Sequence, residues 1–227
     1  MQKEIFCLIP ARSKSKRIKN KNILKIKGFE LIIHTIKFAK KFKNMEICFS
    51  TDSKKYKKIA SRHIKVGPLR PKRLSSDFIK TYDVFKYELN KVEKKLNKKF
   101  KYLLLLQPTV PFRKKKDLIK AFNYIKQKNV DSVVSLNSVG GNHPFRMKKI
   151  NKKDYVLNYT TSKNENMEPI QKLPKVYLRS GSIYLIKRDA FFRYKNLLGK
   201  KVRPIIVKGK YAINIDDKKD MLIAKNV

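Results

Sequence analysis

A run of cations follows the first apolar stretch of the chain. The apolar stretch is Ile5–Ile9, and the loop behind it carries Arg12, Lys14, Lys16, Arg17, Lys19 and Lys21. A buried strand that leads into such a loop and then a helix offers free backbone N–H groups, and cations beside them bind the phosphates of a nucleotide. Arg12 offers a planar fork to a phosphate, while Lys16 and Lys21 act as mobile point charges. A lysine-rich surface loop is the alternative, because lysine is abundant throughout this chain.

Histidine and cysteine, two other residue types that often do chemistry, give weaker signals. The histidines His34, His63 and His143 share no metal-ligand spacing. His143 precedes a proline in an expected loop, where a packing role is favoured over proton transfer. Cys7 and Cys48 each lie in an apolar run. We therefore expect buried free thiols in a reducing cytoplasm rather than a disulfide or a metal site.

Apolar runs bounded by polar turns predict the strands that position these residues. The runs are Ile5–Ile9, Ile47–Ser50, Tyr102–Leu106, Ser132–Leu136, Ile183–Ile186 and Ile205–Val207. Most are continuous rather than alternating, which is typical of strands covered on both faces. Apolar residues at helical spacing predict helices near residues 31–39, 56–60, 84–96 and 118–125, with Ser53 and Asp117 as helix-start residues. This alternation predicts an α/β fold, a mostly parallel twisted sheet with helices on both faces.

The alternation weakens between about Val139 and Leu178. This stretch contains a Gly140-Gly141 pair, three prolines and many polar residues. We expect a small lobe, a substrate lid or a dimerisation arm there, within a single domain over residues 1–227. No apolar stretch approaches the roughly 18 residues that span a bilayer, and Met1–Glu4 leads directly into a strand without room for a signal peptide. The sequence thus predicts a cytoplasmic protein without membrane contact.

The net charge is strongly positive, at +41 from 58 Lys and Arg against 17 Asp and Glu. A charge of this size suggests nucleic acid or an anionic membrane as a partner. The cations are spread over the whole length, however, including the pairs Lys54-Lys55 and Lys94-Lys95 on expected helix faces. A lysine-biased background composition is therefore favoured. A non-enzymatic nucleic-acid-binding protein stays an alternative, although no basic arm and no aromatic stacking motif accompany the cationic loops.

A series of motifs follows in order along essentially the whole chain. They are Ile9-Pro10-Ala11-Arg12 with Ser15-Lys16-Arg17-Ile18 and Lys21-Asn22-Ile23, Ser50-Thr51-Asp52, Arg70-Pro71 with Leu74-Ser75-Ser76-Asp77, Leu105–Arg113, Asp131–Ser135, His143–Arg146, Leu173-Pro174, Gly181–Tyr184, and Ile213–Asp216 with Asp220. Together they resemble the acylneuraminate cytidylyltransferases, the CMP-sialic acid synthetase family. The resemblance implies a Rossmann-like nucleotidyltransferase fold that transfers CMP from CTP to the anomeric hydroxyl of a nonulosonic (sialic-acid-like) sugar acid, with release of pyrophosphate and with Mg²⁺ as cofactor.

The resemblance also implies roles for residues at matching positions. Those positions are Arg12, Lys16 and Lys21 for the triphosphate and for catalysis, Asn22 for the nucleotide, Arg70 and Thr81 for the cytosine and ribose, and Gln107 and Arg146 for the sugar acid. A Thr hydroxyl both donates and accepts hydrogen bonds, which suits a pyrimidine edge. Gln107 has a plain turn residue as its alternative.

Departures from the family pattern keep other interpretations open. Asp216 matches the second aspartate of a metal-binding pair, with helix capping as its alternative, and Asn214 stands where the first aspartate is expected. Ile170 stands where many members have an arginine, for which Lys172 and Arg179 are candidate replacements. The acceptor is therefore open among nonulosonic acids. A CMP-Kdo-type synthetase and a degenerate nucleotide-binding homologue are alternatives, and a homodimer is expected from the resemblance alone.

Overall fold

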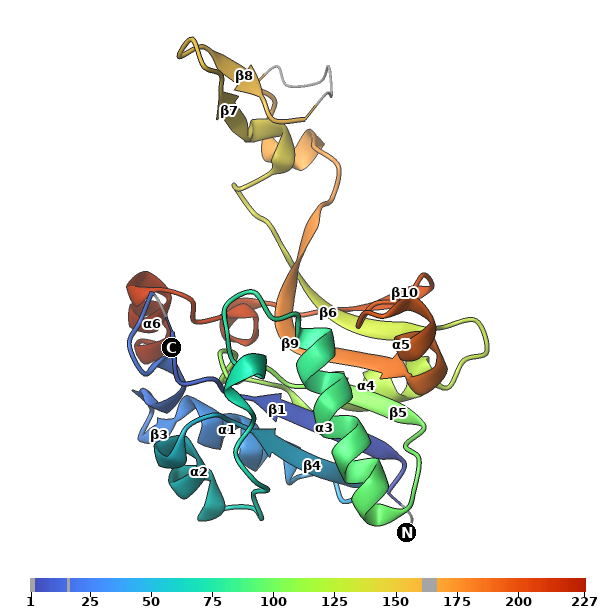
Figure 1. Cartoon of the computed structure of the whole chain (residues 1–227). Helices are drawn as coiled ribbons and strands as arrows, with labels where there is room; N and C mark the ends of the chain where they lie inside the picture. Colours follow the sequence, from blue (N-terminus) through green and yellow to red (C-terminus); the bar gives the residue numbers. More distant parts are fainter. Residues whose placement is uncertain (1–2, 16, 161–166) are drawn as a thin grey trace.

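One six-stranded sheet forms the centre of the computed structural model, which describes residues 3–15, 17–160 and 167–227 (Figure 1). The strands are β1 (Ile5–Pro10), β4 (Met45–Ser50), β5 (Tyr102–Leu105), β6 (Ser132–Ser138), β9 (Tyr177–Lys187) and β10 (Val202–Ile206), in the order β10-β6-β9-β5-β1-β4. β1 runs parallel to β4 and β5, and β10 runs parallel to β6. β9 runs antiparallel to both of its neighbours. The predicted mostly parallel sheet is confirmed, with β9 as the exception.

Helices cover both faces of this sheet, as predicted. Helices α1 (Leu31–Ala39), α2 (Lys54–Ser61) and α4 (Lys115–Ile125) pack on one face, and α3 (Thr81–Leu96) and α5 (Arg188–Tyr194) pack on the other. None of the helices in the described part of the chain is long and apolar enough to cross a membrane.

The two predicted helix-start residues differ in outcome. Ser53 caps α2, because its hydroxyl accepts a hydrogen bond from the Tyr56 N–H at 3.3 Å. The prediction for Asp117 was wrong: α4 begins at Lys115, and Asp117 lies within its first turn. A carboxylate is also stabilised there by the helix dipole, so its residue type could not distinguish the two positions.

The apolar runs become the core. The first, β1, is buried along nearly its whole length. Phe6 of β1 contacts Phe85 of α3 and Phe100 before β5, at ring-centroid distances of 5.5 and 5.6 Å. Burying one such side chain contributes roughly 2–3 kcal/mol. These contacts fix α3 on the sheet, and the residue at the start of α3, Thr81, is one of the predicted site residues.

The ends of three strands meet at one edge of the sheet. Pro10 of β1 is paired with Ser50 of β4, and Leu8 is paired with Leu105 at the end of β5. Tyr184 of β9 pairs with Leu105, and because β9 is antiparallel, the β9 residues that precede Tyr184 lie at this same edge or beyond it. The loops that follow β1, β4 and β5 therefore converge there. In α/β sheets this edge is where ligands bind.

An arm projects from the same region (Figure 1). β6 and β9 stay paired as far as Ser138 and Tyr177, and the chain between them carries a small antiparallel hairpin, β7 (Lys148–Ile150) with β8 (Val156–Asn158). His143 shapes the base of the arm: it is buried, and its ring nitrogens contact the Pro174 carbonyl and the Phe145 N–H at 2.9 and 3.2 Å. The packing role expected for this histidine agrees with these contacts.

The carboxyl-terminal end of α3 is held by a buried carboxylate. The Glu93 side chain is 1% exposed and accepts hydrogen bonds from the Arg188 guanidinium at 3.1 Å to each oxygen, and from the Phe100 N–H at 3.0 Å. Burial on its own would raise the pKa of Glu93. The hydrogen bonds from Arg188, Phe100 and Lys99 outweigh burial, so the pKa lies below its ordinary value.

We predict that Glu93→Gln lowers the free energy of unfolding by about 2–3 kcal/mol near neutral pH, because Arg188 loses its counter-charge. A carboxylate with a lowered pKa stabilises the fold above its unfolded-state pKa, and this contribution is lost as the pH falls through the folded-state pKa. The difference between wild type and variant should therefore shrink in acid. Urea denaturation across pH measures it. Glu46→Gln, which breaks the exposed pair with Lys3, is the control and should lose less than about 1 kcal/mol; equal losses would contradict the prediction.

Candidate active site

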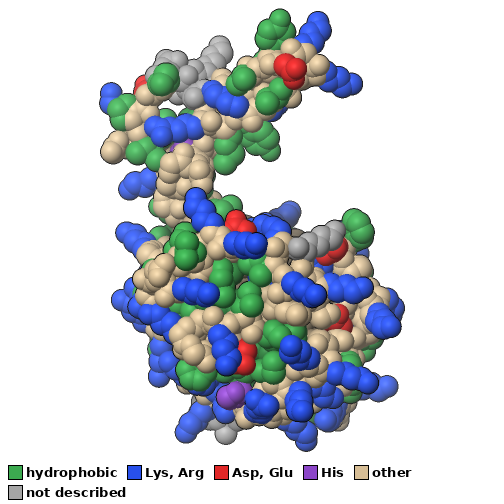
Figure 2. All heavy atoms as spheres, turned by 90° about the vertical axis from the view of Figure 1, so that its left-hand side faces the viewer, with side chains coloured by type: hydrophobic (Ala, Val, Ile, Leu, Met, Phe, Trp, Pro, Cys, Tyr) green, Lys and Arg blue, Asp and Glu red, His purple; other side chains and the backbone are tan. Residues whose placement is uncertain are grey.

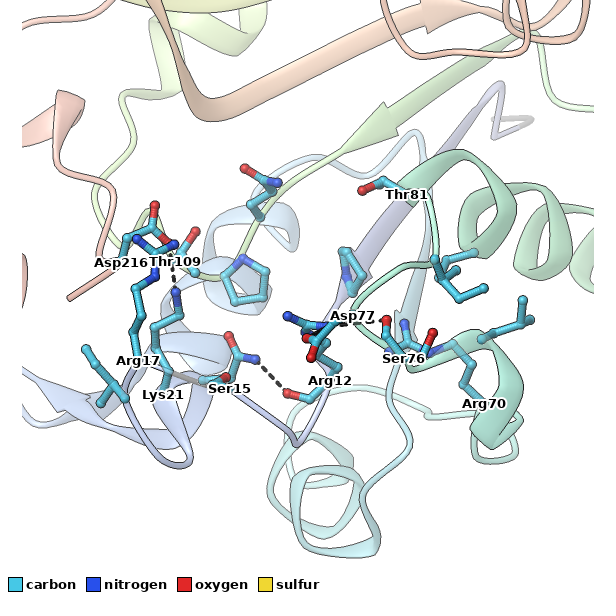
Figure 3. Close-up of a pocket in the computed structure, with 18 residues that line it drawn as sticks. Arg12, Ser15, Arg17, Lys21, Arg70, Ser76, Asp77, Thr81, Thr109 and Asp216 are labelled. Carbon is cyan, nitrogen blue, oxygen red and sulfur yellow. Dashed lines mark hydrogen bonds and ion pairs between the residues drawn. The ribbon is translucent and has the colours of Figure 1, made fainter. Parts of the chain in front are cut away.

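A cleft of about 590 Å³ lies at the converging strand ends (Figure 3). The predicted site residues that line it are Arg12, Lys21, Asn22, Arg70, Thr81, Gln107 and Asp216. They come from the loop after β1, the segment before α3, the turn after β5 and the segment before helix α6 (Lys218–Lys225). Lys16, predicted as a phosphate contact, lies outside the described residues and stays a prediction. The fold thus brings together residues separated by up to two hundred positions in sequence, as the Lys21–Asp216 contact across 195 positions shows.

The loop after β1 is held in shape by polar contacts. Asp52 accepts hydrogen bonds from both the backbone N–H and the hydroxyl of Ser13, each at 2.8 Å. The Asn22 side chain is 6% exposed and donates to the Arg12 carbonyl oxygen at 3.1 Å. Asn22 therefore fixes the backbone that carries Arg12, a role that its residue type alone did not indicate.

Each described cation of this loop that faces the cleft is paired with a carboxylate. Arg12 forms an ion pair with Asp77 and donates to the Ser76 carbonyl oxygen at 3.3 Å. On the opposite side of the pocket, Asp216 accepts from Lys21 at 2.9 Å and lies 3.4 Å from an Arg17 nitrogen (Figure 3). These pairs hold the cationic side chains in the cleft and reduce their mutual repulsion.

Arg17 and Asp77 were part of the quoted motifs but received no role from sequence. Both line the cleft. The available signal was the scarcity of carboxylates: an Asp among so many cations is expected to form an ion pair. Sequence alone does not say which cation it meets, because the loops are brought together only by the sheet.

Arg70 is built into the wall of the cleft. It is 5% exposed, and its guanidinium donates to the Ser75 hydroxyl at 3.1 Å and to the Ser50 hydroxyl at 3.4 Å. Ser50 in turn donates to the buried Glu88 carboxylate at 2.8 Å. Burial lowers the pKa of Arg70, while Asp52 and Glu88 act in the opposite direction. Arg70 is thus a fixed side chain with little rotamer freedom left.

Arg113 orders the turn that carries Gln107. Its guanidinium donates to the carbonyl oxygens of Gln107, Val110 and Ser182 at 2.6, 2.5 and 3.0 Å, and to the Thr35 hydroxyl at 3.1 Å. Burial lowers the pKa of Arg113 to about 9. The sequence motif contained this residue, but only the fold shows that it joins the turn after β5 to β9 and α1.

A second cavity, of about 580 Å³, continues from the first over β9. It shares Thr81, Gln107 and Asp216 with the cleft and is also lined by Arg179 and Asn214. Arg146, predicted to contact the sugar acid, lines neither cavity. It lies on the arm, where it donates to the Glu168 carbonyl oxygen at 3.0 Å and faces a separate hollow. The physical reason is that β6 and β9 continue past the sheet and carry Arg146 away from its edge.

Asp216 lies where the two cavities meet, and Asn214 beside it lines the second cavity. Asp217, not Asp216, caps α6, since its side chain accepts from the Asp220 N–H at 2.9 Å. Asn214 donates to Asp216 at 2.8 Å, and its carbonyl oxygen Oδ1 is buried without a hydrogen-bond partner in the described structure. Asp216 is therefore not used as a helix cap, so it can act in the cleft.

The donor set at this junction suits a magnesium ion held partly by its substrate. Across the described ranges, no group of three or more His, Cys, Asp or Glu side chains could hold a metal ion alone. Mg²⁺ typically uses one or two protein oxygens and takes its other ligands from phosphates and water. The Asp216 carboxylate and the unpartnered Oδ1 of Asn214 fit that arrangement.

Gly181 packs closely against the side chain of Gln107. Its φ is +77°, and a Cβ atom at this position would lie 2.4 Å from Oε1 of Gln107. We predict that Gly181→Ala lowers stability by about 1–2 kcal/mol, because alanine is strained in this backbone conformation and displaces the Gln107 side chain. Thermal unfolding measures the loss. Gly209→Ala is the matched control, since Gly209 also has a positive φ, of +56°, and nothing lies within 4 Å of its Cβ position; an equal loss there would count against the packing argument.

Comparison with known proteins identifies the family of this chain. A family model described as cytidylyltransferase matches residues 6–204. The chain is 32% identical over 224 residues to the post-translational flagellin modification protein B of Campylobacter coli, covering 98% of this chain and 94% of that protein. It is 29% identical over 224 residues to the CMP-N,N'-diacetyllegionaminic acid synthase of Campylobacter jejuni, with the same coverage of 98% and 94%.

Two further matches bear on length and fold. The chain is 31% identical over 222 residues to the N-acylneuraminate cytidylyltransferase of Streptococcus agalactiae. The match covers 96% of this chain but 51% of that protein, so this chain spans about half the length of that relative. A solved CMP:2-keto-3-deoxy-manno-octonic acid synthetase complexed with CTP superposes with a TM-score of 0.66 at 17% identity, over 99% of this chain and 100% of that one, which supports the fold. The family-level resemblance seen in the motifs is confirmed: the chain belongs to the cytidylyltransferase family.

Proposed function

We propose that this protein transfers CMP from CTP to the anomeric hydroxyl of a nonulosonic sugar acid and releases pyrophosphate. The observation that carries the proposal is one cleft, in a chain of the cytidylyltransferase family, that contains Arg12 paired with Asp77 and both Arg17 and Lys21 paired with Asp216. Relatives that match nearly the whole chain include one named for legionaminic acid, and a half-length match is named for acylneuraminate.

The paired cations of the cleft prepare it for a triphosphate. Phosphate oxygens replace the carboxylates of Asp77 and Asp216 as partners of Arg12, Arg17 and Lys21, so little side-chain reorganisation is needed when CTP binds. The acceptor hydroxyl oxygen forms a bond to the α-phosphorus while the bond from that phosphorus to the bridging oxygen of the pyrophosphate breaks. Cations that are already in place stabilise the charge on the departing pyrophosphate. No covalent enzyme intermediate is required.

The nucleoside lies toward the end of the cleft formed by Arg70 and Thr81. These residues are at the side of the pocket away from Asp216 (Figure 3). The Thr81 hydroxyl is exposed at the start of α3 and is available to the base or the ribose. Asn22 holds the Arg12 backbone through its amide nitrogen, and its amide oxygen is its remaining group for a ribose hydroxyl.

We assign Asp216 and Asn214 as the residues that hold Mg²⁺ together with the triphosphate. A bound Mg²⁺ neutralises phosphate charge and polarises phosphoryl oxygens. Because Asn214 supplies an oxygen without a charge, the protein's own contribution to metal affinity rests mainly on Asp216.

The experiment that tests the proposal is a substrate panel. We expect pyrophosphate release from CTP and Mg²⁺ with at least one of N-acetylneuraminic, N,N'-diacetyllegionaminic and pseudaminic acids, and none with Kdo or after addition of EDTA. Turnover with Kdo alone would favour the eight-carbon enzyme. Nucleotide binding without turnover of any acceptor would favour a degenerate homologue.

We predict that Arg12→Ala lowers kcat/KM by about 100-fold or more, because the leaving group loses a charged hydrogen-bond donor. The fold should persist, since the Arg12 side chain is 37% exposed. Coupled pyrophosphate assays and circular dichroism measure the two effects. Lys19→Ala is the control: Lys19 is an exposed cation of the same loop that does not line the cleft. A fully active Arg12→Ala protein would remove the site assignment.

We also propose that the arm forms a homodimer. Its hairpin exposes Ile150, Tyr155, Val156, Leu157 and Tyr159, with exposed fractions from 42% to 71%. A two-stranded hairpin is marginally stable by itself, and clustered exposed apolar side chains mark an interface. The resemblance to a dimerising family makes a second copy of this chain the expected partner.

We predict that the double variant Ile150→Asp with Val156→Asp is a monomer, whereas wild type is a dimer, because two apolar side chains that are exposed in one chain and buried in the proposed dimer become charged. Light scattering coupled to gel filtration measures the mass. Lys153→Asp, at the turn of the same hairpin, controls for the change of charge. A monomeric wild type, or a variant that stays dimeric, would contradict the assignment of the arm as the interface.

Nucleic acid and membrane are not partners in this proposal. Lys and Arg side chains are scattered over the whole face in Figure 2 and are not gathered into one stripe. Binding to nucleic acid is expected to use a basic patch or groove with stacking aromatics. The free thiols Cys7 and Cys48 and the use of CTP lead us to propose the cytoplasm as the place of the reaction.

A further inference from the structure

The second cavity contains a guanidinium that the triphosphate does not use. Arg179 of β9 lines this cavity together with Gln107, and it lies two residues before Gly181, on which the Gln107 side chain rests. β9 is irregular between Arg179 and Tyr184, where its pairing with β6 shifts register. Arg179 and Gln107 nevertheless line the same cavity, which meets the nucleotide cleft at Asp216.

The charge in this cavity is uncompensated. Its ionisable lining includes the cations Lys80, Arg179 and Lys195 and the carboxylate of Asp216. Asp216 is already engaged by Lys21 and Arg17. The Arg179 side chain makes no hydrogen bond or ion pair with any residue of the described ranges, although its backbone pairs with Leu136 of β6. An anionic ligand of small size, with polar groups for Gln107 and Asn214, fits this lining.

We propose that Arg179 binds the carboxylate of the acceptor sugar acid, an inference that rests on the proposed function. A guanidinium presents two parallel N–H donors that match a carboxylate, which the ammonium groups of Lys80 and Lys195 do not. In a 2-keto sugar acid, the anomeric carbon bears both the carboxylate and the attacking hydroxyl. A fixed carboxylate therefore limits where the hydroxyl can lie, and Arg179 with Gln107 directs it toward the α-phosphorus.

This assignment places the carboxylate contact within the chain that binds CTP. Arg146, the residue that the motif suggested for the sugar acid, is held on the arm by the Glu168 carbonyl oxygen and lines neither cavity. Arg179 is exposed at the sheet edge and takes no part in the core. Its substitution is expected to leave the fold intact.

The test is Arg179→Met, assayed with CTP and whichever of the three nonulosonic acids the wild type accepts. The KM for the acid should rise about 10- to 100-fold, as expected for loss of a charge-assisted hydrogen-bond pair, while the KM for CTP stays within about twofold. The carboxamide analogue of the same acid should be used equally by wild type and variant, because it lacks the charge. Arg179→Lys should recover part of the loss. Arg193→Met, an exposed arginine of α5, is the matched control.

Several results would overturn the assignment. One is an equal rise in the KM for CTP in Arg179→Met, which would make Arg179 a phosphate contact. Another is a rise in the KM for the acid in Lys195→Met or Lys80→Met but not in Arg179→Met. If the wild type turns over no acceptor, the proposed function fails separately. Ligand-observed NMR of the same acids in the presence of CMP then decides: binding that is lost in Arg179→Met supports the carboxylate site, and no binding to wild type removes it.

Discussion

Repulsion between like charges is the constraint that the cleft must satisfy. Arg12, Arg17 and Lys21 come from one short loop, and at close range in a partly desolvated site their repulsion opposes folding. Two carboxylates offset this repulsion by forming ion pairs. Asp77 pairs with Arg12 on one side of the pocket, and Asp216 pairs with Lys21 and Arg17 on the other. The cleft thus remains open and charged at the same time.

The sheet makes these pairs possible. The two carboxylates, Asp77 and Asp216, are far apart in the chain, one before α3 and one before α6. Asp77 reaches the loop after β1 because β4 lies beside β1 and parallel to it, so that the segments after both strands leave from a common edge. Asp216 follows β10, at the other side of the sheet, and its segment is held at the turn after β5 by the hydrogen bond from the Ile215 N–H to the Thr109 carbonyl oxygen at 2.8 Å. A strand order that moved β1 to the edge of the sheet would separate the two halves of the pocket. The buried apolar runs, which carry no chemistry, therefore decide where the charges meet.

Much of this architecture could be predicted from sequence because its signals are local. Continuous apolar runs indicated the strands, helical spacing indicated four helices, and ordered motifs indicated the family. The antiparallel direction of β9 could not be predicted, since an apolar run such as Ile183–Ile186 has no direction in its composition. The contacts of Arg113 and Gly181 with the turn that carries Gln107 could not be predicted from sequence either. They depend on β5 and β9 being neighbours, which is a property of the sheet and not of either segment.

Strand β9 belongs both to the arm and to the wall of the second cavity. At one end it leaves the sheet as a stem of the arm, and a few residues later it supports Gln107 through Gly181 and supplies Arg179 to the second cavity. Its pairing with β6 is irregular between Arg179 and Tyr184, and β5 pairs only with its last residues, Tyr184–Lys187. One continuous strand therefore carries both the stem of the arm and two residues that line the second cavity, Arg179 and Gly181. The spacing between the hairpin and this cavity is consequently set by the number of residues in β9, so an insertion or deletion in this strand would alter both at once.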